Sequence, residues 1–264
     1  MINFKLKNLN EIVPVGQEPN QNLSWFWLTD GELWFNFENI IIYEYTPEAL
    51  NYFGDKLSPY NDYYIVRFIE DFTQLFDKIS EVIPEKFYAF TKTIEEFKTN
   101  SKKWLDVYDT NENSDFYFDE FYKLMSWINE RTLYSGHLIG GPNLSFFRQN
   151  DKVRIIWQTE YVLENGINLW TAKNGSCEIN YIDFVNEIKI FGERFFAEMD
   201  KQIESTLAKN FENIQLNKKR LVDEHQERKD DFWNAFKILE HESVVKTDWE
   251  DIEKVYTQMV TEIK

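Results

Sequence analysis

The alternation of apolar and polar residues predicts a strand at the start of the chain and an aromatic hairpin after it. Residues 2–7 alternate with the period of a half-buried strand. Two aromatic runs follow, 23–29 and 32–37, and the Asp30-Gly31 dipeptide between them readily supplies the positive φ values of a tight turn. We therefore expect a hairpin across which the tryptophans of both runs pack, extended by residues 40–45.

Apolar residues spaced three and four apart predict helices in the middle of the chain. Segment 62–83 carries such a stripe, and Pro84 ends it. Thr46-Pro47-Glu48 can open a short helical turn before it. Two more helices are expected at about 93–108 and 115–131, separated by a polar loop.

Glycine then becomes dense, which predicts a structured turn into a second group of strands. Three glycines fall within residues 136–141, and Pro142 follows. Short strands are predicted at 144–148, 152–158, 168–172 and 176–180, and their turns are typical of an antiparallel meander. A long apolar stripe from Phe184 to Ile203 predicts a helix after the meander.

The remainder of the chain differs in character. Residues 217–231 are nearly all charged or amide residues, which is typical of an exposed helix, and apolar spacing returns at 232–239 and again at 249–263. The pattern as a whole predicts an α+β fold, with antiparallel sheets packed against several amphipathic helices. We divide it into a core domain of residues 1–208 and a C-terminal helical hairpin of residues 209–264.

Charge is the feature of the composition that bears most on function. The chain has 46 acidic and 29 basic side chains, a net charge of −17, together with 9 Trp, 14 Tyr and 23 Phe. A strongly negative shell repels nucleic acid and anionic membranes and attracts cationic partners. The lone Cys177 and the lack of a long apolar run indicate a cytoplasmic protein.

Metal and cofactor chemistry finds little support in the sequence. Three histidines and one cysteine leave few ligands for zinc-like metals, and no calcium-binding loop pattern occurs, so we expect no metal and no cofactor. Glu224 and Glu227 flank His225 about one helical turn apart and could hold a metal if His241 joined them. Arg228, at i+4 from Glu224, is better placed to neutralise that carboxylate.

One polar cluster is dense enough to resemble an active site. Glu130, Arg131, Ser135 and His137 surround the first glycine of the turn, and Ser135 could act as a nucleophile with His137 or Glu130 as base. Adjacent residues of an extended segment point apart, however, and no glycine precedes Ser135 as in a nucleophile elbow. The structural interpretation is that Arg131 caps or pairs at a helix end.

Several blocks, taken in order, resemble an uncharacterised bacterial family of unknown function. Early blocks are Trp25 to Gly31 and Asp62 to Asp71; later ones are Glu130 to Leu133, Leu138 to Pro142, Phe146 to Arg148, Val153 to Trp157 and Trp170 to Ala172. The resemblance covers about residues 2–203. It implies no activity and no catalytic residues.

The leading functional hypothesis is a binding protein for a basic partner. The acidic shell and the abundant aromatic residues favour a cytosolic module of the immunity or antitoxin kind, which neutralises a basic enzyme such as a nuclease. The alternative is a hydrolase-like enzyme of small molecules, with its site at residues 130–137. A third hypothesis is self-association through the last two helices.

Overall fold

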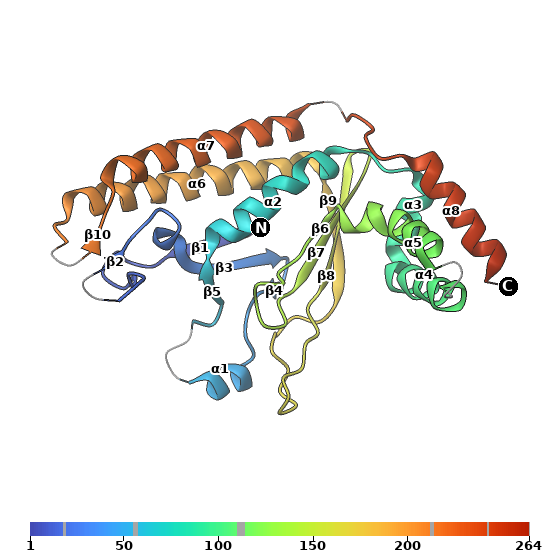
Figure 1. The fold of residues 1–264 in the computed structure, drawn as a ribbon, viewed down its shortest axis with the longest axis horizontal. Helices are drawn as coiled ribbons and strands as arrows, with labels where there is room; N and C mark the ends of the chain where they lie inside the picture. Colours follow the sequence, from blue (N-terminus) through green and yellow to red (C-terminus); the bar gives the residue numbers. More distant parts are fainter. Residues whose placement is uncertain (18–19, 55–57, 110–113, 212–213, 242, 264) are drawn as a thin grey trace.

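Two antiparallel sheets share one aromatic core in the computed structural model, which describes residues 1–17, 20–54, 58–109, 114–211, 214–241 and 243–263 (Figure 1). In the first sheet, the central strand β3 (Asp30–Phe37) pairs with β1 (Ile2–Leu6), β4 (Ile40–Ile42) and β5 (Asn61–Tyr64). Side chains alternate along β3, so that Leu33, Phe35 and Phe37 are buried. The predicted first strand and the extension at residue 40 are therefore confirmed.

The predicted hairpin turn at Asp30-Gly31 is wrong. Residues 27–29 form a short 3-10 turn, and Gly31 lies inside β3 opposite Leu6. A Cβ atom on Gly31 would lie 2.4 Å from the Lys5 carbonyl oxygen. The glycine therefore permits close approach of β1 and does not supply a positive φ. The turn of the actual hairpin, between β3 and β4, contains Glu38 at φ 55°.

The second sheet confirms the predicted antiparallel meander. Its order is β6-β7-β8-β9, comprising β6 (Thr132–Leu133), β7 (Asn143–Gln149), β8 (Lys152–Gln158) and β9 (Gly175–Asn180). Phe37 of the first sheet stacks on Trp157 of the second, with ring centroids 5.1 Å apart, so the two sheets share a core. The predicted strand at 168–172 is wrong, because that segment bonds to residues 44–46 in a loop and joins neither sheet's ladder.

Helices cover the sheets in two groups. The buried hydrophobic residues form two clusters. Around the first cluster, which includes residues of both sheets, lie α2 (Ile65–Ser80), α6 (Tyr181–Ala208) and α7 (Lys218–Glu240), with α7 running along α6 in Figure 1. Around the second cluster lie α3 (Glu85–Phe90), α4 (Ile94–Tyr108), α5 (Ser114–Asn129) and α8 (Trp249–Glu262). The α+β class and the central helices are thus confirmed, although residues 62–64 of the predicted helix belong to β5.

The two predicted C-terminal helices are present but do not form the expected hairpin. α7 packs on α2 and α6, whereas α8 packs on α5 and α4 at the other end of the molecule (Figure 1). Each helix therefore contributes to a different core cluster. That residues 1–208 form a core domain of their own stays a prediction. A short parallel bridge between β2 (Gln21–Asn22) and β10 (Ile214–Gln215) fixes the start of α7 beside the N-terminal loop.

A remaining helix, α1 (Pro47–Phe53), stands apart from both groups and confirms the predicted helical turn. Thr46 caps it by accepting a hydrogen bond from the Ala49 amide, and Pro47 occupies its first turn.

Candidate functional site

Arg131, one of the four residues proposed from the sequence, is completely buried and serves the core. Its Nη2 lies 2.7 Å from Glu81 Oε2, and both side chains are 0% exposed. Its Nη1 donates to the Trp127 carbonyl oxygen at the end of α5. Glu81 also accepts hydrogen bonds from Thr247 and Trp249, at the start of α8. Arg131 therefore joins three segments and cannot touch a substrate.

Glu130, its neighbour in sequence, faces away from the core. Its carboxylate pairs with Lys78 Nζ at 2.6 Å, and the Glu130 side chain is 45% exposed. The two adjacent candidates thus lie in different environments, as expected for consecutive side chains where a helix has ended.

Ser135 and His137 do line one small cavity, about 10 Å³ in volume, together with Tyr43, Asn61 and Asp71. A space of that size holds about one water molecule. Asn61 Oδ1 is buried there without a hydrogen-bond partner among the described residues. The cavity therefore suits one small polar molecule.

The hydrogen bonding in this cavity does not activate Ser135. Its Oγ lies 2.5 Å from the Tyr43 hydroxyl, and burial raises the pKa of Tyr43, so the tyrosine is not available as a base near neutral pH. His137 packs against Tyr63 at 5.0 Å. Burial lowers the pKa of His137, and nearby Asp71 opposes that shift. The structure thus brings Ser135 and His137 to one cavity and places Glu130 and Arg131 elsewhere.

Tyr43, Asn61 and Asp71 were missed as members of this cavity. They come from the end of the first sheet and from α2, more than sixty positions before Ser135 in the chain. No local motif connects them, so only the packing of α2 against the sheets could reveal them.

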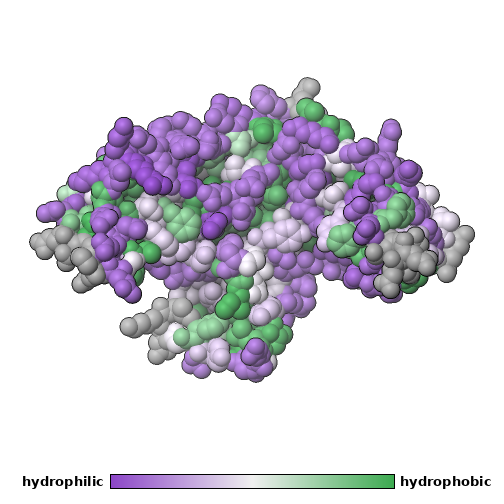
Figure 2. All heavy atoms as spheres, viewed as in Figure 1, coloured by the Kyte–Doolittle hydropathy of each residue, from purple (hydrophilic) through white to green (hydrophobic). Residues whose placement is uncertain are grey.

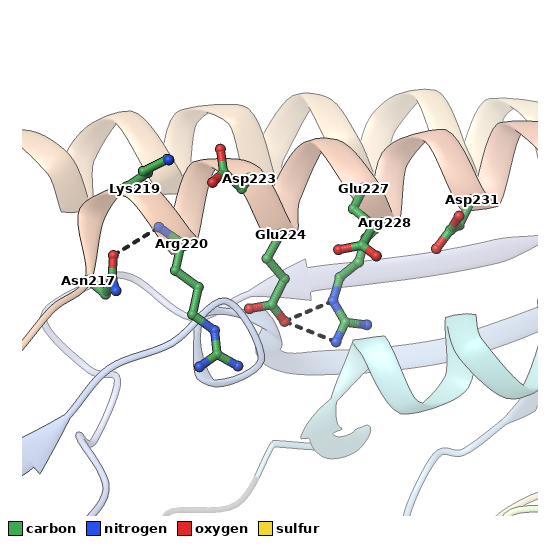
Figure 3. Close-up of a pocket in the computed structure, with 8 residues that line it drawn as sticks. All are labelled: Asn217, Lys219, Arg220, Asp223, Glu224, Glu227, Arg228 and Asp231. Carbon is green, nitrogen blue, oxygen red and sulfur yellow. Dashed lines mark hydrogen bonds and ion pairs between the residues drawn. The ribbon is translucent and has the colours of Figure 1, made fainter.

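A larger hollow, about 570 Å³ in volume, lies along α7 (Figure 3). The predicted ion pair within it is confirmed, because Arg228 Nη2 lies 3.0 Å from Glu224 Oε1. Arg228 also pairs with Glu70 of α2. The Arg228 guanidinium lies over the Trp25 ring. The alternative of a metal site at Glu224, His225 and Glu227 loses its histidine ligand. His225 Nδ1 accepts a hydrogen bond from Trp25, and its Nε2 contacts Asp200 at 2.7 Å.

Besides the cations Lys219, Arg220 and Arg228, this hollow is lined by Asp223, Glu227 and Asp231, which we call the acidic stripe (Figure 3). They follow one another at i, i+4 and i+8 on α7, all three are exposed, and none has a salt bridge within the described residues. Like charges at this spacing repel by a few tenths of a kcal/mol per pair. The three carboxylates of the stripe therefore repel one another in the free protein.

The residues that the structure describes offer neither a metal-binding cluster nor a membrane-spanning helix. No three His, Cys, Asp or Glu side chains gather there in a way that could hold a metal ion. None of the helices in that part of the chain has the length and apolar character needed to cross a bilayer.

Comparison with known proteins identifies a family without an assigned activity. A family model described as a family of unknown function (DUF5984) matches residues 1–255. The resemblance expected over residues 2–203 is thereby confirmed, and the match extends through α7 and into α8. No curated protein and no solved structure matches the chain.

Proposed function

The chain belongs to this family of unknown function, and we propose that it is a binding module that recognises and neutralises a basic partner protein. The observation that carries this proposal is the acidic stripe on a protein of net charge −17. These carboxylates have no salt bridge in the described part of the chain, so they add to the negative field of the protein, which attracts a cationic partner. Such a field also steers a basic protein toward its binding orientation.

The same field disfavours nucleic acid as a ligand. Binding to a phosphate backbone requires a surface that replaces released counterions with Lys or Arg, whereas this surface is dominated by carboxylates. A basic enzyme that itself acts on phosphates, such as a nuclease, fits the opposite requirement, because its cationic active site is complementary to an acidic protein.

The alternative function, a hydrolase-like enzyme at residues 130–137, has less support. Ser135 contacts Tyr43 and not a base, and the cavity beside it has a volume of only about 10 Å³. Arg131, one of the four residues proposed for that site, is 0% exposed. Catalysis there would require Ser135 to change partners and the cavity to enlarge.

The proposal is tested with purified cationic proteins encoded by the genes that flank this one. Association rates are measured by stopped-flow fluorescence at about 0.02 and 0.2 M salt, and any enzymatic activity of the partner is titrated with this protein. We expect a complex whose association rate falls at least about tenfold with salt and whose formation inhibits the partner. If none of the cationic proteins tested forms a salt-sensitive complex, the proposal is wrong.

A further inference from the structure

Three segments that are far apart in sequence converge at the lower edge of the molecule in Figure 1. They are α1, the glycine-rich turn 136–142, and the loop 159–174 between β8 and β9. We call this region the tip. It projects beyond the two sheets, away from α6 and α7 (Figure 1).

Specific contacts join the three segments of the tip. Trp170 Nε1 donates to the Gly140 carbonyl oxygen at 2.7 Å, which connects the loop to the turn. Tyr45 stacks on Trp170 with centroids 4.5 Å apart, and Thr46, the cap of α1, donates to the Asn168 carbonyl oxygen at 2.6 Å. The tip is thus a built surface and not three independent loops.

The glycine-rich turn supplies the close contact at its centre. Gly140 has φ +56°, and a Cβ atom there would lie 2.2 Å from the Tyr161 ring. The ring therefore lies against bare backbone, which only glycine allows. This packing joins the loop 159–174 to the turn at Gly140.

The tip exposes several large apolar side chains. Figure 2 shows hydrophobic side chains gathered on the lower projection. Five large side chains are exposed there: Tyr52 by 58%, Phe53 by 42%, Ile139 by 70%, Tyr161 by 40% and Val162 by 54%. Scattered exposed apolar residues are ordinary, but a group of them on one projection marks an interaction surface.

Carboxylates surround this apolar centre. Glu48 of α1 and Glu160 and Glu164 of the loop are exposed, and none has a salt bridge within the described residues. Lys173 is the exposed cation of the same segments in the part of the chain that the structure describes. An apolar centre with a polar, charged rim is the usual anatomy of a protein interface.

We propose that the tip is the docking surface for the basic partner, and that the partner presents an apolar centre ringed by Lys or Arg. This inference rests on the proposed function and assigns the contact to one place. The acidic rim selects the occupant, because it would repel the same rim of a second copy and the anionic headgroups of a membrane. The buried aromatic and aliphatic contacts would then set the lifetime of the complex.

A pair of matched variants tests the assignment. The tip variant Tyr52→Ser/Ile139→Ser/Val162→Ser removes three exposed apolar side chains. The control variant Phe116→Ser/Phe118→Ser/Tyr122→Ser removes three side chains of α5 that are 46–53% exposed, and so reduces surface hydrophobicity similarly elsewhere. Thermal unfolding of both variants is measured first, so that loss of fold is recognised.

The partner is identified by photo-crosslinking in the cells that make the protein. A photoreactive phenylalanine is placed in the full chain at position 52, 139 or 162, or at the control positions 116, 118 and 122. We expect adducts with a protein of high pI from the tip positions alone. The dissociation rate of that purified protein should rise at least about tenfold with the tip variant and stay within about twofold with the control.

The other outcomes separate this inference from the proposed function. A basic partner that crosslinks or loses affinity only through other surfaces leaves the proposed function standing and overturns the tip. Adducts of the tip with a second copy of this chain, with lipid or with an acidic protein overturn the assigned occupant. If none of the tip positions gives an adduct, the docking surface itself is overturned.

Discussion

Removing the carboxylate of Glu81 should destabilise the protein far more than breaking a partly exposed ion pair close to it in the chain. Glu81 accepts hydrogen bonds from Arg131 Nη2 at 2.7 Å, from the Thr247 hydroxyl at 2.7 Å and from Trp249 Nε1 at 2.8 Å. The variant Glu81→Leu leaves the Arg131 guanidinium buried without its counterion. Loss of one partner of a buried pair costs about 3–5 kcal/mol.

This loss is large enough to measure by thermal or urea unfolding. For a chain of this size, each kcal/mol corresponds to about 2–4 °C in Tm, so Glu81→Leu should lower Tm by roughly 6–20 °C. The matched control is Glu130→Gln, which breaks the Lys78–Glu130 pair, whose side chains are 22% and 45% exposed, and leaves the hydrogen bond from Lys78 to Thr247 in place. That change should cost no more than about 1 kcal/mol.

A double-mutant cycle identifies the cause. Replacing both members, Glu81→Leu with Arg131→Met, removes the unpaired charge and should recover much of the loss, because apolar pairs often replace buried ion pairs at little net cost. Hydrogen exchange of α8 gives a second measurement, since Thr247 and Trp249 fix the start of that helix through Glu81. If Glu81→Leu costs no more than Glu130→Gln, the carboxylate does not organise this region.

Three further predictions concern packing, reactivity and charge. Gly192→Ala should lower Tm despite its better helix propensity, because the new Cβ would lie 2.3 Å from the Phe232 ring, and Phe232→Leu should partly restore it. Burial raises the pKa of Cys177 to about 11, so alkylation at pH 8 should be far slower than for a free thiol and should speed up as pH rises toward that value. Stability should fall over the same rise, because the folded thiol keeps its proton longer than the unfolded one, and Cys177→Ser should reduce this slope. Converting the acidic stripe to its amides should raise Tm slightly; a fall would show that the three carboxylates have stabilising partners.

The sequence predicted the fold wherever a local period determined burial. The stripes of α2 and α6 repeat every three or four residues, and β7 and β8 are bounded by clear turns, so their existence followed from the pattern. Gly31 was misassigned because its role depends on the Lys5 carbonyl of another strand. A dipeptide pattern reports the backbone preference of its two residues and not which strand will pair beside them.

The same distinction explains what could be predicted about the sites. Arg228 and Glu224 are four residues apart on one helix, so their pairing followed from helix geometry alone. Arg131 and Glu81 are separated by 50 positions, and Tyr43 and Ser135 by 92, so their contacts depend on how the helices pack on the sheets. Candidate residues chosen for their proximity in sequence were therefore divided between a buried pair, a small cavity and the surface.

Salt dependence can locate the encounter with the partner, because the acidic stripe and the rim of the tip lie on different sides of the molecule (Figure 1). Charges act over about 8 Å at physiological ionic strength but over about 30 Å at 0.01 M. If docking occurs at the tip, amides at Glu48, Glu160 and Glu164 should slow association at physiological salt more than amides on the stripe. At low salt the two variants should become alike, since the stripe then contributes to the field felt by the approaching partner. A stripe variant that remains the slower one at every salt concentration would instead place the docking surface on α7.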